Sequence, residues 1–346
     1  MASTASRSAA GGAALAAARQ AAAVAPGLIL AIAIAWAAKS VAGFLPFPAV
    51  FVALALGVAV AGFAASGPAE AGLTVGGRDL LRAGVALLGA QVTLTEIAGL
   101  GPEPFLIAIA SVLVTLGLGY PLARAIGVAR GPALLAAGGV AICGASAILA
   151  IAAVLPKGRA SDEEAAATVA AVTILGTIGM IAFPVAAAAL GLSPTATGIF
   201  LGATLHEVVQ AVGAGFSVSD PVGETATAVK LIRVACLAPV VILLGWAAQR
   251  GQAKMPEAKV AILPWFLVGF IALAALSSLH VLPPLWIAAM GEASRWCLLV
   301  GIAALGAKLS IPRLLAIGAR PAIALSAQSL IIAGFALGMI LLFGIG

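Results

Sequence analysis

The sequence predicts an all-α polytopic membrane protein with about eleven hydrophobic segments, and its composition and charge distribution are the reasons. Of the 346 residues, 63% are hydrophobic and only 9% are charged, whereas a soluble domain carries about 25% charged residues. The charges gather in short islands, such as residues 157–164 and 249–259. The runs between the islands are long and apolar, and about 20 such residues cross the roughly 30 Å of hydrocarbon in a bilayer.

The apolar runs between charged or Pro/Gly interruptions define the expected segments. Residues 1–25 precede them and are expected to form a flexible cytoplasmic tail, because Arg19 interrupts an alanine-rich stretch that makes a poor signal peptide. Residues 26–346 then form one transmembrane transporter domain with no soluble module. The expected segments are about 26–43, 47–64, 80–98, 104–124, 131–155, 164–190, 195–217, 225–248, 261–281, 285–309 and 321–344.

An internal repeat relates two parts of the chain. Residues 81–104 align without gaps on residues 298–321, and Gly and Pro positions such as Gly89/Gly306 and Pro104/Pro321 are shared. Duplicated halves with glycine-interrupted helices are typical of secondary transporters. The alignment therefore predicts an inverted repeat, with one unit near 80–190 and the other near 195–344.

Lysine and arginine in the short loops predict the orientation, since these residues stay on the cytoplasmic side. Arg7 and Arg19 place the N-terminus inside, and counting crossings puts the other basic loops inside except the one at 157–159. That exception disappears if segments 131–155 and 195–217 enter from opposite faces and turn back near the midplane. The alternative is a pair of broken helices that do cross.

Both of these segments carry glycine on either side of a polar centre, AAGGVAICGASA at 136–147 and GATLHEVVQAVGAG at 202–215. Non-helical backbone at membrane depth survives where it is buried or lines a wet cavity, and a helix N-terminus at such a break is an anion site. The alternative is that small residues only let the helices pack closely. The expected substrate-binding residues are Cys143, Gly144, Ala145, Ser146, Thr204, His206, Gln210 and Lys308.

His206 and Glu207 are expected to couple a proton or sodium ion to transport. An ionisable group at bilayer depth costs about 2.5–3.5 kcal/mol and usually faces a partner or water on a functional path. Histidine changes its charge near physiological pH, and Glu207 shares a helix face with Gln210, three residues on. The alternative is a structural polar pair that ties two helices together.

Positive side chains lie at depth as well. Lys230 and Arg233 share a face of their segment, and Lys308 is the repeat partner of Gln91. We expect Lys230, Arg233 and Gln91 to compensate charge. Because Glu207 is the main acid at depth, the balance is positive and indicates an anionic substrate.

Other functions find little support in the sequence. HEVVQ at 206–210 approaches the HExxH motif of zinc proteases, but Gln210 stands where the second histidine belongs. An intramembrane metalloprotease is therefore a remote alternative, and we expect no enzyme activity, no metal and no cofactor. The net charge of +6 comes mostly from loop residues, so membrane topology explains it and no nucleic-acid partner is expected.

The motifs resemble those of the YeiH-like sulfate exporter family of bacterial inner-membrane transporters, which is similar to the broader cation–proton antiporter and anion transporter group. The resemblance rests on LLRAGVALLGAQVTLTEIAGLG (80–101), GVAICGASAILA (139–150), TLHEVVQAVGAG (204–215) and GIAALGAKLSIPRLL (301–315). It implies broken helices that meet at the midplane, elevator-type movement, and export of sulfate or sulfite.

These observations together predict a multi-pass secondary active transporter of a small anion, such as sulfate or another sulfur oxyanion, in a bacterial inner membrane with a cytoplasmic N-terminus. An anion channel or an uncoupled organic-anion carrier is the alternative. The direction of transport, the coupling ion and the oligomeric state, a homodimer included, stay open at this point.

Overall fold

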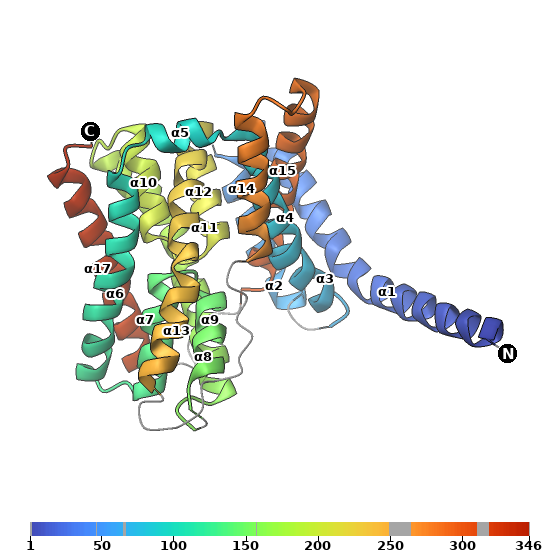
Figure 1. Ribbon diagram of the computed structural model, residues 1–346, viewed down its shortest axis with the longest axis horizontal. Coiled ribbons are helices and arrows are strands. Elements are labelled where there is room, and N and C mark those ends of the chain that lie inside the picture. The colour runs from blue at the N-terminus through green and yellow to red at the C-terminus, as the bar shows by residue number, and fades with distance from the viewer. Residues whose placement is uncertain are drawn as a thin grey trace. The chain divides into compact units, whose positions relative to one another are not determined.

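A computed structural model describes residues 2–45, 47–64, 67–156, 158–248, 264–309 and 318–345, and in these residues all regular structure is helical (Figure 1). The described residues leave out Lys157, residues 249–259 and residues 310–317. Some of the basic residues that predicted the orientation, and part of the second repeat copy, therefore lie outside the described residues. Six helices of the described part are long and apolar enough to cross a membrane: Arg19–Ala42, Glu103–Ala125, Asp162–Ala189, Asp220–Ala247, Pro284–Ala307 and Ala319–Leu342.

The helices that form the outside of the fold present apolar side chains to their surroundings. Leu113, Val185 and Leu330 are 62%, 65% and 70% exposed. Exposing so much apolar surface to water is energetically unfavourable, whereas the same surface is compatible with contact with lipid chains. This surface and the long apolar helices identify a multi-pass membrane protein.

The chain divides into two compact units, Met1–Gly84 with Arg295–Ser310 (unit 1) and Val85–Ser294 with Ile311–Gly346 (unit 2). Unit 1 contains α1 (Ala2–Ala42), α2 (Ala49–Ala64), α3 (Glu70–Val75), a π-helical turn (Gly76–Leu80) and the second half of α15 (Pro284–Ala307). Glycines let these helices touch, since a methyl group at Gly57 would overlap the carbonyl oxygen of Ala303. α1 is continuous from Ala2 to Ala42, and the boundary expected after residue 25 stays a prediction.

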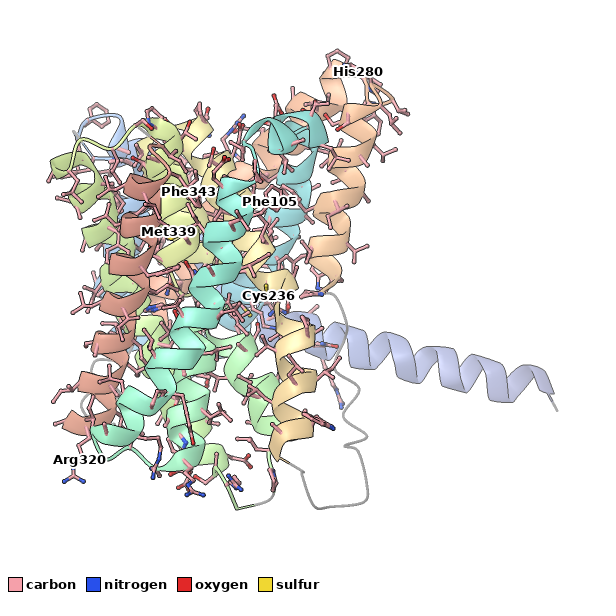
Figure 2. The ribbon with its side chains drawn as sticks, turned by 60° about the vertical axis from the view of Figure 1, so that its left-hand side comes forward. Phe105, Cys236, His280, Arg320, Met339 and Phe343 are labelled. Carbon is pink, nitrogen blue, oxygen red and sulfur yellow. The ribbon has the colours of Figure 1, made fainter. Side chains whose placement is uncertain are left out.

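The frame of unit 2 consists of long helices: α6 (Glu103–Ala125), α9 (Asp162–Ala189), α12 (Asp220–Ala235), which continues as α13 (Leu237–Ala248), and α17 (Ala319–Leu342). α6 and α17 run antiparallel. Figure 2 shows Phe105, near the start of α6, at the same end as Met339 of α17 and Phe343 directly after this helix, with Arg320 at the opposite end.

The predicted segment 131–155 is a hairpin made of α7 (Arg130–Ala141) and α8 (Ala145–Val154). Methyl groups at Gly138 and Gly139 would overlap Ile151 and Ile148, so the two short helices run back along each other. A methyl group at Gly131 would likewise overlap the carbonyl oxygen of Arg159, which places the start of α7 beside the chain that follows α8. We call this α7–α8 pair hairpin A.

The segment 195–217 is a second hairpin, made of α10 (Pro194–Thr204) and α11 (Val208–Val218) and called hairpin B. Gly198 contacts Thr225 and Gly202 contacts Val229, so α10 runs parallel to α12. Gly215 contacts Gly223 across the turn between α11 and α12, so α11 runs antiparallel to α12. α10 and α11 are therefore antiparallel to each other.

The two hairpins enter unit 2 from opposite ends, and Figure 1 shows hairpin A at one end of α9 and hairpin B at the other. α9 has 28 residues, about 42 Å of helix, and it separates the loops from which the hairpins start. Of the two possibilities that the sequence left open, the structure has segments that turn back. Arg159 lies at the same end of unit 2 as Arg130, as the alternative with segments that turn back requires, and the side of the membrane on which this end lies stays a prediction.

The predicted segment 80–98 is not one helix. It divides into α4 (Leu81–Leu88), a 3-10 turn (Gly89–Gln91) and α5 (Leu94–Gly99). Thr93 starts the new helix with a capping box, because its hydroxyl accepts from the Glu96 N–H while the Glu96 carboxylate accepts from the Thr93 N–H. Since part of the repeat partner 298–321 lies outside the described residues, the inverted repeat stays a prediction. α14 (Trp265–Ser278) completes unit 2.

Candidate functional site

The turns of the two hairpins meet near the middle of α9. We call Ile142–Gly144 of hairpin A and Leu205–Glu207 of hairpin B the two tips. A methyl group at Gly139 would lie 3.5 Å from Val172 Cγ2 of α9, and the Gln210 side-chain amide donates to the Thr173 carbonyl at 3.0 Å. The helical backbone is interrupted at both tips, deep in the fold.

Each tip has a local reason to leave the helical conformation. Gly144 has φ +59, in the left-handed region that side chains disfavour, so glycine is required at this turn. Leu205 and Glu207 are extended, with ψ of 145 and 154. The carbonyl groups released in this way need other donors, since a buried carbonyl without a partner is costly.

Lys230 supplies three of these donors. Its Nζ donates to the carbonyl oxygens of Ile142 at 2.8 Å, Leu205 at 2.6 Å and His206 at 2.8 Å. An ammonium group has three N–H bonds, and each of them has an acceptor here. The side chain is fully buried, and it joins the tip of hairpin A to the tip of hairpin B.

Arg233, one turn further along α12, binds the ends of the two incoming helices. Its Nη2 donates to Val140 at 2.6 Å and to Ala141 at 2.8 Å, and its Nε donates to Ala141 at 3.0 Å. Its Nη1 donates to Gly202 at 3.2 Å and Leu205 at 2.8 Å. The C-terminal ends of α7 and α10 carry partial negative charge and unpaired carbonyl groups, so two buried cations hold both ends.

The carboxylate of Glu207 lies between the tips. Its Oε1 accepts from the Thr173 hydroxyl at 2.7 Å, while its backbone N–H donates to Gln210 Oε1 at 3.0 Å. A methyl group at Gly144 would lie 2.5 Å from Glu207 Cγ and 3.0 Å from Oε1. Glu207 of hairpin B is therefore packed directly against the turn of hairpin A.

The His206 ring is 2% exposed and is held on two sides. Nδ1 lies 3.3 Å from the Val172 carbonyl oxygen, which only accepts, so Nδ1 carries a proton. Nε2 lies 3.0 Å from the Ser329 hydroxyl of α17, and this hydroxyl also lies 2.8 Å from the Leu325 carbonyl oxygen. The ring thus connects hairpin B to α9 and α17.

A rough charge count gives the tips a positive balance. The two C-terminal helix ends carry about −0.5 each and the N-terminal ends of α8 and α11 carry about +0.5 each, so the four ends cancel. Lys230 and Arg233 add two positive charges, and an ionised Glu207 removes one. The count leaves the tips with a net charge of about +1.

Most of the site residues predicted from the sequence lie together at or next to the tips. Thr204 is among them, although its hydroxyl donates to Phe200 of its own helix at 2.6 Å. The residues that the structure brings together are Cys143, Gly144, Ala145, Ser146, Thr204, His206, Glu207, Gln210, Lys230 and Arg233.

Two predicted residues have their described contacts elsewhere. Lys308 belongs to unit 1, where its Nζ donates to the Thr74 hydroxyl at 2.8 Å. The Gln91 side chain donates to the Ile287 carbonyl at 2.9 Å, beside α14 and α15. No contact described for Lys308 joins it to the tips, so its expected role in anion binding between the breaks stays a prediction.

The sequence did not reveal Thr173 and Ser329. Both are hydroxyl residues in apolar helices, where such side chains commonly bond to their own backbone, as Thr177 does to the Thr173 carbonyl. Their contacts with Glu207 and His206 depend on how the helices pack. No spacing in the sequence points to that packing.

Comparison with known proteins places the chain among bacterial membrane proteins. Residues 26–325 match the family described as Conserved hypothetical protein 698. A UPF0324 membrane protein of Rhizobium meliloti is 42% identical over 316 residues, which cover 90% of this chain and 91% of the relative. The UPF0324 membrane protein TauZ of Paracoccus pantotrophus is 41% identical over 313 residues, with 90% and 93% covered. No solved structure matches the chain.

Proposed function

The chain belongs to the family described as Conserved hypothetical protein 698, and on that premise we propose that it is a secondary active transporter of a small anion. The relatives named above are called membrane proteins, and their names state no substrate. The proposal depends on the hairpin tips, and one observation carries it. Lys230 and Arg233 are fully buried between the tips, which keeps positive charge at the point where both hairpins turn.

The paired hairpins support transport. Non-helical backbone at membrane depth is tolerated where it is buried in protein or lines a water-filled cavity. Transporters place substrate where broken helices meet near the midplane, with helix N-termini directed at anionic groups. Here the N-termini of α8 and α11 both start at the tips.

The charge at the tips supports an anionic substrate. Because the C-terminal helix ends are held by Lys230 and Arg233, the positive balance is built into the resting fold and does not depend on a mobile side chain. The resemblance to the YeiH-like sulfate exporter family suggests sulfate, sulfite or another sulfur oxyanion as the first candidates. Cys143, Gly144, Ala145, Ser146, Thr204, His206 and Gln210 are the proposed surroundings of the anion.

We assign the coupling role to Glu207, with His206 as the residue that holds the tip in place. A proton on the ring would add positive charge beside Lys230, whose Nζ already binds the His206 carbonyl oxygen. A proton or sodium ion at Glu207 would instead neutralise the negative charge at the tips. The ring is also held between Val172 and Ser329, as a positioning role requires.

The proposed location is a bacterial inner membrane with the N-terminus in the cytoplasm. Arg130 and Arg159 lie at one end of unit 2, and Arg320 lies beside Gly127 at that same end. Positively charged loops stay on the cytoplasmic side. The proposed oligomeric state is a homodimer. Native mass spectrometry of the purified protein would measure it.

Flux into proteoliposomes tests the proposal. We expect saturable uptake of labelled sulfate, sulfite or a small organic anion, and accumulation above the external concentration when a pH or sodium gradient is imposed. Linear, non-saturating flux without accumulation would instead support an anion channel. Saturable flux without accumulation would support an uncoupled carrier, and no flux of any tested anion would reject the proposal.

A further inference from the structure

We infer that the Glu207 carboxylate is a tethered ligand of the anion site: it occupies the site in the empty protein, and it must be neutralised by a proton before the anion binds. The inference rests on the proposed function and deepens it, because it names the competitor of the substrate and the order of events. It also specifies one proton for each anion.

The first line of support is what stands at the start of α8. Gly144 is the N-cap residue of this helix and has no side chain to cap it. The space that a side chain at Gly144 would need is occupied by Glu207, whose Cγ and Oε1 lie 2.5 and 3.0 Å from an added methyl carbon. The Glu207 side chain of the other hairpin therefore fills the space beside the N-terminus of α8, where an anion is favoured, and it also accepts from the Gln210 backbone N–H in the capping box of its own helix α11.

The second line of support is the positive surroundings. Lys230 and Arg233 are fully buried and hold the backbone of both tips. Without Glu207, the rough charge count at the tips is about +2, and with it about +1. Glu207 thus already acts as a counter-anion, and a substrate anion would compete with it for the same positive surroundings.

The third line of support is Thr173, which can serve either anion. Its hydroxyl donates to Glu207 Oε1 at 2.7 Å. A protonated carboxyl group is a weaker acceptor than a carboxylate, since bonds to ionised acceptors are about twice as strong. Once Glu207 takes up a proton, the Thr173 hydroxyl becomes available to an incoming oxyanion, and Gln210 continues to hold the Glu207 backbone.

The sequence of events follows from charge. A proton from the aqueous phase binds a carboxylate oxygen of Glu207, the anion enters the site, and both leave together when the site faces the other side. Dissociation of the proton returns the carboxylate to Gly144 and closes the cycle. A monovalent anion would then cross without net charge, and a divalent anion with one net negative charge.

Direct binding of labelled sulfate and sulfite to the purified full-length protein tests the inference. For the wild type we expect affinity to weaken about tenfold for each pH unit above the range in which Glu207 is protonated, because one proton is linked to one anion. Glu207→Gln, which is neutral and nearly the same shape, should bind with the low-pH affinity of the wild type at every pH. Glu224→Gln, which removes an acid of α12 away from the tips, should keep the wild-type pH dependence.

Proton uptake by the wild type provides a measurement that needs no variant. In weakly buffered solution, one proton should be taken up for each anion bound, and Glu207→Gln should show none. Uptake of no proton by the wild type, or an unchanged pH dependence in Glu207→Gln, would overturn the inference and leave the proposed function standing. If the wild type binds none of the tested anions at any pH, the proposed function fails together with the inference.

Discussion

Replacing Lys230 by methionine should separate the two tips and destabilise the protein strongly. Methionine nearly matches lysine in length, so the substitution removes the ammonium group and opens little space. The carbonyls of Ile142, Leu205 and His206 then lose their Lys230 donor. Leu205 keeps a bond from Arg233, which leaves two buried carbonyls without a described donor.

The magnitude follows from those two carbonyl groups. A buried acceptor left unpaired costs about 1–3 kcal/mol, so Lys230→Met should lower the free energy of unfolding by about 2–6 kcal/mol. With roughly 2 °C of melting temperature for each kcal/mol, the midpoint should fall by about 4–12 °C. Flux should be lost even at temperatures where the variant stays folded, because, among the described donors, Arg233 alone then joins the two hairpins and the Ile142 and His206 carbonyl groups have lost their Lys230 donor.

Thermal unfolding in detergent, followed by intrinsic fluorescence, measures the effect. Lys308→Met is the matched control, since it removes the same charge from an exposed side chain whose described bond goes to Thr74. It should change the free energy of unfolding by less than about 1 kcal/mol. Equal melting temperatures for the two variants would refute the reasoning that Lys230 joins the tips.

Three further substitutions test the tips. Gly144→Ala should abolish flux, because the added methyl group overlaps Glu207 and alanine is strained at a φ of +59. Gly158→Ala is the control: Gly158 has φ +82 but open space around it, so this variant should be destabilised only by the backbone strain of about 1–2 kcal/mol. Arg233→Lys should lower the free energy of unfolding by about 2–4 kcal/mol, because lysine cannot reproduce the planar fork that reaches α7 and α10; equal denaturant midpoints would contradict this. Ser329→Ala should lower the free energy of unfolding by about 1–3 kcal/mol and reduce flux, because His206 Nε2 loses its hydroxyl partner. Ser217 is the control residue, since its hydroxyl donates to Ala214 of its own helix, and Ser217→Ala should lower the free energy of unfolding by less than about 1 kcal/mol.

The helices and the two breaks could be predicted because their causes are local. Glycine at 144 is required by a positive φ, and the basic residues around hairpin A favoured a segment that turns back, as the structure has it. The prediction of one continuous helix over 80–98 was wrong, because it overlooked a local capping signal. Thr93 and Glu96 form a capping box that ends the expected segment 80–98 early, and the pattern was present in the sequence.

The partners of the site could not be predicted, because they depend on packing between distant helices. Glu207 is bound by Thr173, 34 residues away, and His206 contacts Ser329, 123 residues away. Lys230 and Arg233 were recognised as deep positive charges, but nothing in their spacing shows that they bind backbone carbonyls. Lys308 was selected through the repeat, and its described partner Thr74 lies in a part of the chain that the repeat does not include.

The location of the bound anion is the most direct test of the central claim, that the substrate site lies between the two tips. The measurement is a structure of the full-length protein with selenate, whose scattering distinguishes it from water. We predict selenate density at the N-terminus of α8, within hydrogen-bond distance of the Thr173 hydroxyl, with Glu207 turned away from Gly144. Selenate bound elsewhere in the fold, with Glu207 still against Gly144, would contradict the claim.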